Sequence, residues 1–357
     1  MSHSPVAGRL LSAAWLAAAI ALATTALGAN PPIAQPSAQN GDQPLAAANA
    51  ALQAGEADKA LDLLAPVAQS GPGAALAHNL ICRVRLTLEQ WDAAATECEL
   101  AAQLDPQNSD FHLWLGRALG QKASRAAFLA AFSLAKRTRA EFEEAVQLNP
   151  RNADALSDLG DFYRQAPGVV GGGIDKAQAI VVQLEKVDMG RAHKLRAQIA
   201  EQQKDSSTAE REYKLAVTAD AHPADAWSSL ASFYNRRQRF DDMESAIQSA
   251  LAAALHDHRP GPALYDGAGL LIESKRNPTL AATLLEDYLA GSSRTEDAPA
   301  FIAHIRLARL KQELGDQAAA NRERAAALAL AHEYKPARDF KAQAGTQQAA
   351  AQQRASY

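Results

Sequence analysis

The chain has 357 residues, of which 48% are hydrophobic, and its 36 basic and 40 acidic residues give a formal net charge of −4 at pH 7. This composition is sufficient for a sizeable core. Charges of both signs are spread along the chain with no basic block, so there is no electrostatic footprint for binding nucleic acid. Alanine is abundant and β-branched residues are few, which favours helix throughout.

The first 28 residues are predicted to be a signal peptide rather than part of the fold. Arg9 provides a short basic region, and residues 10–27 form an apolar run that ends in small residues before Ala29. The alternative is an uncleaved run that anchors the chain in the inner membrane, since its length is about enough to span a bilayer. In either case we expect a bacterial protein exported to the cell envelope, in the first case to the periplasm.

A short leader and a long repeat region follow. Residues 29–43, rich in Pro, Gln and Ser, are expected to be a disordered leader, and residues 344–357 a disordered tail. Between them, apolar residues recur at helical spacing in a repeated pattern. We expect helical hairpins at residues 45–70 and 74–104, and then around residues 109–145, 156–181, 192–219, 227–250, 265–288 and 307–327. Residues 334–343 are expected to cap the open end of the stack.

Two segments show the repeat most clearly. In LDPQNSD and LNPRNAD the prolines Pro106 and Pro150 each follow an alanine by five residues and precede a glycine by ten. Each proline ends a helix, and each glycine, Gly116 or Gly160, lets two helices approach closely. The two segments are therefore two copies of one unit.

Further residues make the repeat recognisable. Trp227, Leu230, Ala231 and Tyr234 form an apolar stripe at i, i+3, i+4 and i+7. They match the first-helix signature of the tetratricopeptide repeat (TPR) family, and Phe142, Ala145 and Pro150 match its second-helix signature. The chain resembles this family across residues 45–343. The resemblance implies an all-α fold, a right-handed superhelical solenoid of about eight TPR-like hairpins over residues 44–343.

The third and fourth hairpins depart from the pattern by insertions at residues 122–137 and 167–173. The first insertion is apolar and helix-forming, so we expect it to lengthen a helix or form a packed lid. The second contains Gly171, Gly172 and Gly173 shortly before Lys176. It lacks the Gly-Lys-Ser/Thr ending of a phosphate loop and follows a helix, so a glycine-rich connector is expected. These four residues remain candidates for a partner contact, because long loops in compact repeats are often functional.

Two cysteines, Cys82 and Cys98, lie on the two helices of the second hairpin, on faces that should meet. An even count in an exported chain allows a disulfide. The competing interpretation is two small buried apolar residues, which are common for cysteine in helical cores. Two thiols without a histidine at ligand spacing do not indicate a metal site.

The family resemblance implies that the first helices of the hairpins line a concave groove that binds a protein or peptide. It places these residues in the groove: Asn79, Arg83, Asp110, Arg117, Ser157, Asp161, Arg164, Gln165, Lys194, Gln198, Asp225, Asn235 and Arg236. Their mixture of charges and amides suits peptide recognition. The competing interpretation is that they are simply the solvated faces of amphipathic helices.

No familiar catalytic motif is present, and no stretch is left over for a catalytic domain. We therefore expect a non-enzyme without cofactor or metal that scaffolds an assembly in the cell envelope. Membrane contact is expected only through an uncleaved signal peptide. The alternative is a small-molecule-binding accessory subunit of a solute transport system, with the two insertions roofing a pocket.

Overall fold

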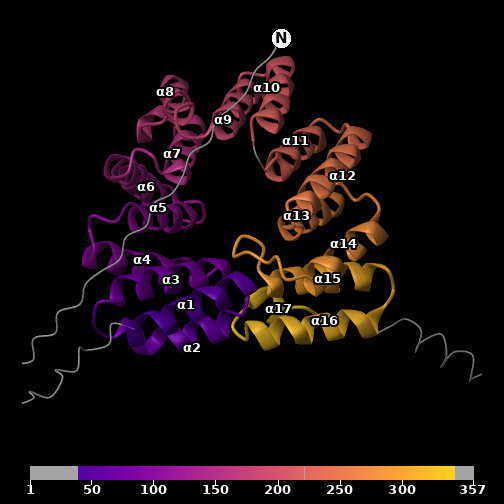
Figure 1. Ribbon diagram of the computed structural model, residues 1–357, viewed down its shortest axis with the longest axis horizontal. Coiled ribbons are helices and arrows are strands. Elements are labelled where there is room, and N and C mark those ends of the chain that lie inside the picture. The colour runs from indigo at the N-terminus through magenta and orange to yellow at the C-terminus, as the bar shows by residue number, and fades with distance from the viewer. Residues whose placement is uncertain (1–38, 221, 342–357) are drawn as a thin grey trace, which may run out of the picture. The chain divides into compact units, whose positions relative to one another are not determined.

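The computed structural model describes residues 39–341 except residue 221, and all regular secondary structure in this part of the chain is helical (Figure 1). The predicted signal peptide and the tail at 344–357 lie outside these residues, as does most of the predicted leader. None of the described helices is both long and apolar enough to cross a membrane.

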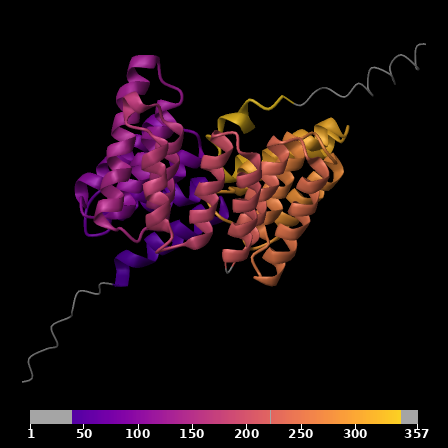
Figure 2. The same cartoon turned by 90° about the horizontal axis from the view of Figure 1, so that it is seen from above.

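Sixteen of the helices pair into eight consecutive hairpins, which confirms the predicted all-α helical-repeat fold. The hairpins are α1 (Gln39–Ala54) with α2 (Ala57–Ala68), α3 (Ala74–Thr87) with α4 (Trp91–Leu104), α5 (Ser109–Ala123) with α6 (Phe128–Leu148), α7 (Ala153–Gln165) with α8 (Ile174–Leu184), α9 (Met189–Gln202) with α10 (Ser206–Ala219), α11 (Ala224–Arg236) with α12 (Phe240–His256), α13 (Gly261–Glu273) with α14 (Pro278–Ala290), and α15 (Ala300–Glu313) with α16 (Gln317–Leu330). A short helix, α17 (Lys335–Arg338), follows. Seen from above, the axes of neighbouring helices in the stack are roughly aligned (Figure 2).

The first helix begins earlier than predicted. α1 starts at Gln39, so residues 39–43, assigned from the sequence to a disordered leader, are helical. The buried face of α1 includes Leu45, Ala48 and Leu52. Leu45 packs on this face almost two turns after the start of α1. The helix therefore begins within the polar segment that precedes Leu45.

The two copies of the repeat unit are built alike. Asn108 and Asn152 are the N-caps of α5 and α7: the Asn108 side chain accepts hydrogen bonds from two backbone N–H groups of the first turn, and that of Asn152 from one. In the third hairpin a Cβ at Gly116 would lie 2.5 Å from the ring of Phe142. The close approach of α5 and α6 therefore requires glycine there.

The two insertions take different forms. Residues 122–137 lengthen a helix, since α6 has 21 residues and the connection to α5 is short. Residues 167–173 form a compact connector that contains a 3-10 turn (Gly168–Val170) and a left-handed residue, Gly171, with φ of 96°. A Cβ on Gly172 would lie 1.8 Å from the carbonyl oxygen of Ala166, so the glycines here permit a tight connection.

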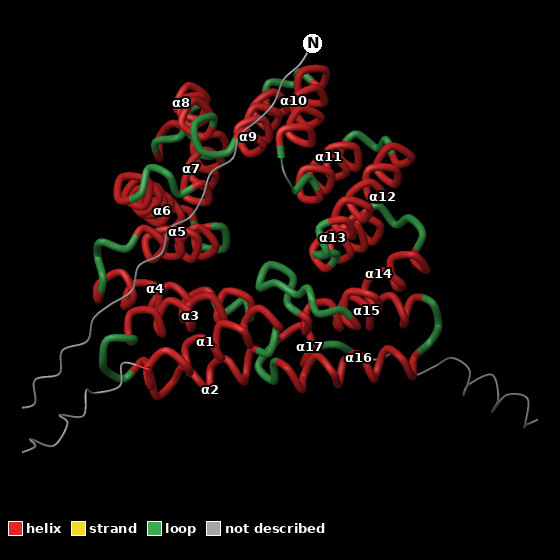
Figure 3. The backbone as a smooth tube through the Cα atoms, in the orientation of Figure 1, coloured by secondary structure: helices red, strands yellow, loops and turns green. Residues whose placement is uncertain are grey.

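The first and last hairpins pack against each other, so the stack closes on itself. One hydrophobic cluster contains Leu45, Ala48 and Leu52 of α1 together with Phe301 and Ile305 of α15. In Figures 1 and 3, α2 and α16 accordingly lie end to end, and the start of α2 meets the end of α16.

We call the contact between the first and last hairpins, together with the polar contacts around it, the seam. Arg83 of α3 donates two hydrogen bonds to Glu296, at 2.8 and 2.5 Å. Arg85 donates to Glu333 at 2.7 Å, and the N–H of His332 donates to Asp58 at 2.9 Å. Glu296 lies on the loop at residues 291–299 between α14 and α15, which reaches toward the first hairpins (Figure 3).

The seam corrects the expectation of an open C-terminal end. Tyr334 is buried with Phe301 at a ring-centroid distance of 4.9 Å, in the cluster that the first hairpin shares. α17 does not cap an exposed end, because the first hairpin already covers the last one.

Candidate functional site

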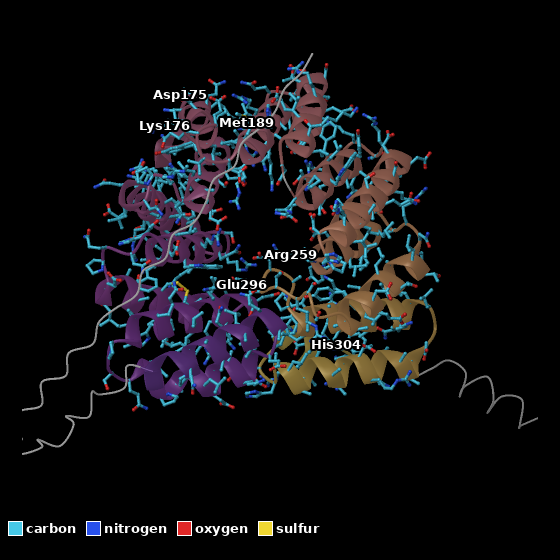
Figure 4. The ribbon with its side chains drawn as sticks, viewed as in Figure 1. Asp175, Lys176, Met189, Arg259, Glu296 and His304 are labelled. Atoms are coloured by element: carbon cyan, nitrogen blue, oxygen red, sulfur yellow. A yellow bond between two sulfur atoms is a disulfide. The ribbon has the colours of Figure 1, made fainter. Side chains whose placement is uncertain are left out.

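The first helices of the hairpins surround three adjoining cavities of about 830, 760 and 490 Å³, which share Lys194 and Ser229. We call their union the central cavity. Its lining comes mainly from α5, α7, α9, α11, α13 and α15, as expected for a solenoid whose first helices face inward. The loop at residues 291–299 adds Thr295, Asp297 and Ala298. In Figure 4, Arg259 lies beside the central opening and Glu296 at the seam.

Most of the residues predicted for the groove line the central cavity. They are Arg117, Ser157, Asp161, Arg164, Gln165, Lys194, Gln198, Asp225 and Arg236. The helical repeat accounts for this result, because equivalent positions of successive first helices point the same way.

Four predicted residues lie elsewhere. Asn79 is only 2% exposed on α3, which packs against α1, α4 and α5, so the expectation that it is available to a partner is wrong. Arg83 is used in the seam with Glu296. Asp110 accepts a hydrogen bond from Asn152 at 2.9 Å, and Asn235 is half-buried beside the cavity lining.

Several charges in the central cavity are already paired. The Arg117 guanidinium donates to Asp158 at 2.5 Å, and Arg164 donates to Asp161 at 2.7 Å. Arg236 forms an ion pair with Glu201. These arginines shape the wall, and their carboxylate partners reduce the charge they offer to a ligand.

Other cavity charges form no ion pair with any described residue. The cationic ones include Lys194, Arg259 and Arg306, and the anionic ones include Asp225 and Asp266. The Arg306 guanidinium stacks 4.3 Å from the ring centroid of Tyr265, which also lines the cavity. The wall therefore presents unpaired charges of both signs beside an aromatic ring.

The enclosed setting raises the pKa of three cavity carboxyl groups. Burial raises the pKa of Asp266 to about 6, with a further contribution from the charge of Asp225. Burial is also the main cause of the raised pKa of Asp158 and of Asp297. The Asp266 side chain is accessible from the cavity, but protein on most sides of the cavity weakens its hydration. Carboxylates held in such surroundings are typical of functional sites.

The glycine-rich connector is not arranged as a phosphate cradle. The N–H of Gly173 donates to the carbonyl of Tyr163 at 2.8 Å, and the N–H of Gly171 donates to that of Gly168 at 2.9 Å. Lys176 donates to the carbonyl oxygen of Gly171 at 2.9 Å. In Figure 4, Asp175 and Lys176 lie at the outer end of their hairpin. A partner contact by this loop stays a prediction.

Neither insertion roofs the central cavity. No residue of 122–137 or 167–173 lines the central cavity. The central cavity therefore does not support the prediction of a small-molecule site roofed by these insertions.

Cys82 and Cys98 form a disulfide with a Cα–Cα distance of 5.3 Å. Both cysteines are fully buried, and the bond ties α3 to α4. The sequence allowed either a disulfide or two buried free cysteines, and the structure has the disulfide. The bond joins the two helices of the hairpin that supplies Arg83 and Arg85 to the seam.

A recurring polar pair was missed in the sequence. His78, His193 and His304 each contact a glutamate 19 residues later, at 2.6 to 2.8 Å, in their own hairpin. His112 does the same with Glu141 after 29 residues, because the insertion in the third hairpin adds ten residues to this spacing. The constant spacing was visible in the sequence. Among the described residues, no group of three or more His, Cys, Asp or Glu is arranged to hold a metal ion.

Comparisons with known proteins yield solved structures only. No family model matches the chain, and no curated protein matches it. TTC0263, a thermophilic TPR protein from Thermus thermophilus, is 19% identical with a TM-score of 0.46, over 54% of this chain and 98% of that chain. The Cut9–Hcn1 hetero-tetramer of the APC/C is 12% identical with a TM-score of 0.39, over 84% of this chain and 55% of that chain.

Proposed function

We propose that this chain is a non-catalytic scaffold of the bacterial cell envelope that holds an extended segment of another protein in its central cavity. The observation that carries the proposal is the set of unpaired charges of both signs on the cavity wall, among them Lys194, Arg259 and Asp225. An extended segment carries backbone donors and acceptors along its length and side chains of either charge. A wall built from many helices can pair with such a ligand one residue at a time.

Two features support a location outside the cytoplasm. The N-terminal 28 residues have the pattern of a signal peptide. The Cys82–Cys98 disulfide suits an oxidising compartment such as the periplasm. The alternative of an inner-membrane anchor at residues 10–27 would leave the repeat domain in the same compartment.

The absence of catalysis is part of the proposal. The unpaired cavity charges are of both signs and are distributed over α9 to α15 and the loops between them, which suits recognition along a segment better than chemistry at one bond. The four histidine–glutamate pairs each join the two helices of one hairpin, and none of these histidines lines the central cavity.

Lys194 offers the sharpest test, because it lines all three parts of the cavity and forms no ion pair with a described residue. Reversing its charge in Lys194→Glu should lower capture of the partner roughly tenfold or more, since like charges then meet in the cavity. Arg117 and Arg164 are poorer choices, because their substitution would also strip Asp158 and Asp161 of a partner.

The experiment is affinity capture of the tagged chain from crosslinked, detergent-solubilised envelope, read by mass spectrometry. Lys186→Glu is the matched control, because Lys186 is exposed outside the cavity and the charge change is the same. One or two proteins retained by the control and lost with Lys194→Glu would support the proposal. Equal capture by both variants would contradict cavity binding.

A further inference from the structure

The first turns of α6 expose the largest uncovered apolar side chains in the described part of the chain. Phe128 is 84% exposed and Leu129 is 82% exposed. Phe132 follows Phe128 by one turn, and Lys136 follows Phe132 by another, so these residues share one face of the helix. The Lys136 ammonium lies 4.5 Å from the ring centroid of Phe132. We call this set, with Arg125 just before the helix, the α6 face.

Although the chain has no basic block, the segment around the α6 face lacks acidic residues. Residues 111–140 contain six Lys and Arg residues and no Asp or Glu, in a protein whose net charge is −4. Four of the six have carboxylate partners: Lys122 with Asp92, Arg137 with Glu99, Arg117 with Asp158, and Arg139 with Glu143. Arg125 and Lys136, the two on the α6 face, have no carboxylate partner among the described residues. Arg125 stacks on Trp91 at 4.2 Å instead.

The geometry points to an anionic lipid surface as the occupant of the α6 face. Phe128 and Leu129 stand at the N-terminal end of α6, which with 21 residues is the longest described helix, and would enter the boundary between headgroups and acyl chains, as the apolar face of an interfacial helix does. Arg125 and Lys136 flank them and would pair with anionic headgroups. This contact is distinct from the sequence-based expectation, in which only an uncleaved signal peptide touches the membrane.

The size of the α6 face favours lipid over protein. A stable protein interface buries about 800 Å² on each partner, whereas this face offers two strongly exposed apolar side chains, Phe128 and Leu129, beside the partly buried Phe132. An interfacial contact with lipid gains strength from the apolar area that it buries and from each basic residue near an anionic surface. None of these residues lines the central cavity, so lipid contact leaves the cavity free. The inference therefore stands or falls separately from the proposed function.

A spin label at the helix tip tests the contact on the full chain. The native cysteines are bonded to each other, so Leu129→Cys would supply the one free thiol among the described residues. Leu255→Cys on α12 is the matched control, because Leu255 is also an exposed leucine, at 63%. Each labelled protein is mixed with vesicles of phosphatidylcholine alone or with added phosphatidylglycerol, and exposure to a water-soluble relaxing agent is measured.

We expect the label at position 129 to become shielded with phosphatidylglycerol vesicles, while the label at 255 stays exposed. Adding Arg125→Gln or Lys136→Gln should weaken this shielding about fivefold in vesicle concentration for each charge removed. The label reports whether position 129 itself is shielded from water. A chain held to the vesicle only by its N-terminal apolar run would therefore not be mistaken for contact through the α6 face. Equal shielding on uncharged vesicles would overturn the inference. So would a label at 129 that stays exposed to water with both kinds of vesicle. A label at 129 whose motion slows only when envelope proteins are added would indicate a protein partner instead, and would also overturn the inference.

Discussion

At the residue scale, Asp266 is a cavity carboxylate whose negative charge lowers the stability of the folded state. Its carboxyl group faces the cavity near Asp225, and its pKa is raised to about 6, even though Arg306 and Lys194 oppose the shift. The unfolded value is about 3.9, so the folded state binds this proton more tightly. The free energy of unfolding therefore falls as pH rises from about 4 to about 6, and the loss persists above that range. An unpaired carboxylate kept at this cost is typical of a binding residue.

Asp266→Asn should therefore raise the thermal midpoint at pH 8, by roughly 1–3 °C after allowance for solvent screening. The gain should shrink to nothing near pH 4, where the wild-type carboxyl group is protonated in most folded molecules. Thermal melts at pH 4, 6 and 8 measure the effect, with Asp62→Asn on the exposed face of α2 as the control. A gain that is absent at pH 8, or that does not change with pH, would show that Asp266 is not destabilised by its charge.

At the element scale, the hairpins were predictable because their signals are local. Asn108 caps α5 three residues before a buried phenylalanine, and Gly116 marks a close helix contact within the same hairpin. The sequence left open whether residues 122–137 lengthen a helix or form a packed lid. Phe128 can pack only if a neighbouring element reaches it, and its own segment carries no information about that neighbour. The structure extends the helix and leaves Phe128 exposed.

The disulfide of the second hairpin belongs to this scale. The bond joins residues 16 apart, so constraint of the unfolded chain should contribute about 3 kcal/mol. Cys82→Ala/Cys98→Ala should accordingly lower the denaturation midpoint in urea, and adding reductant to the unfolded wild-type chain should remove most of the difference. Refolding the reduced wild type separates loss of the bond from loss of side-chain volume. Equal midpoints for oxidised wild type and the double variant would mean that the bond does not stabilise the hairpin.

At the scale of the whole molecule, closure of the stack is what the sequence could not supply. A repeat pattern specifies how each hairpin packs on the next, whereas contact between the first and last depends on rotation accumulated over all eight. The central-cavity positions Arg117, Asp161 and Lys194 follow from the repeat. Asn79 and Arg83 were misplaced because α3 lies at the seam, where packing and Glu296 occupy positions that would otherwise face a partner. No repeat signal marks the loop at residues 291–299, so its contribution to the cavity was missed as well.

Gly55 allows this closure to be tested directly. It lies in the turn of the first hairpin with φ of 74°, and a Cβ there would lie 2.3 Å from the backbone nitrogen of Ala300. Gly315 lies in the turn of the last hairpin with φ of 84° and has nothing within 4 Å of that position. Alanine at either site costs about 1 kcal/mol for the left-handed backbone, but only Gly55→Ala also forces α1 and α2 away from α15.

We expect Gly55→Ala to enlarge the radius of gyration in small-angle scattering and to reduce hydrogen-exchange protection in α2 and α16, while the middle hairpins stay protected. Gly315→Ala should leave the radius of gyration unchanged. Identical scattering from the two variants would mean that the seam survives without the close approach at Gly55. The hydrophobic cluster shared by α1 and α15 would then be sufficient to hold the first and last hairpins together.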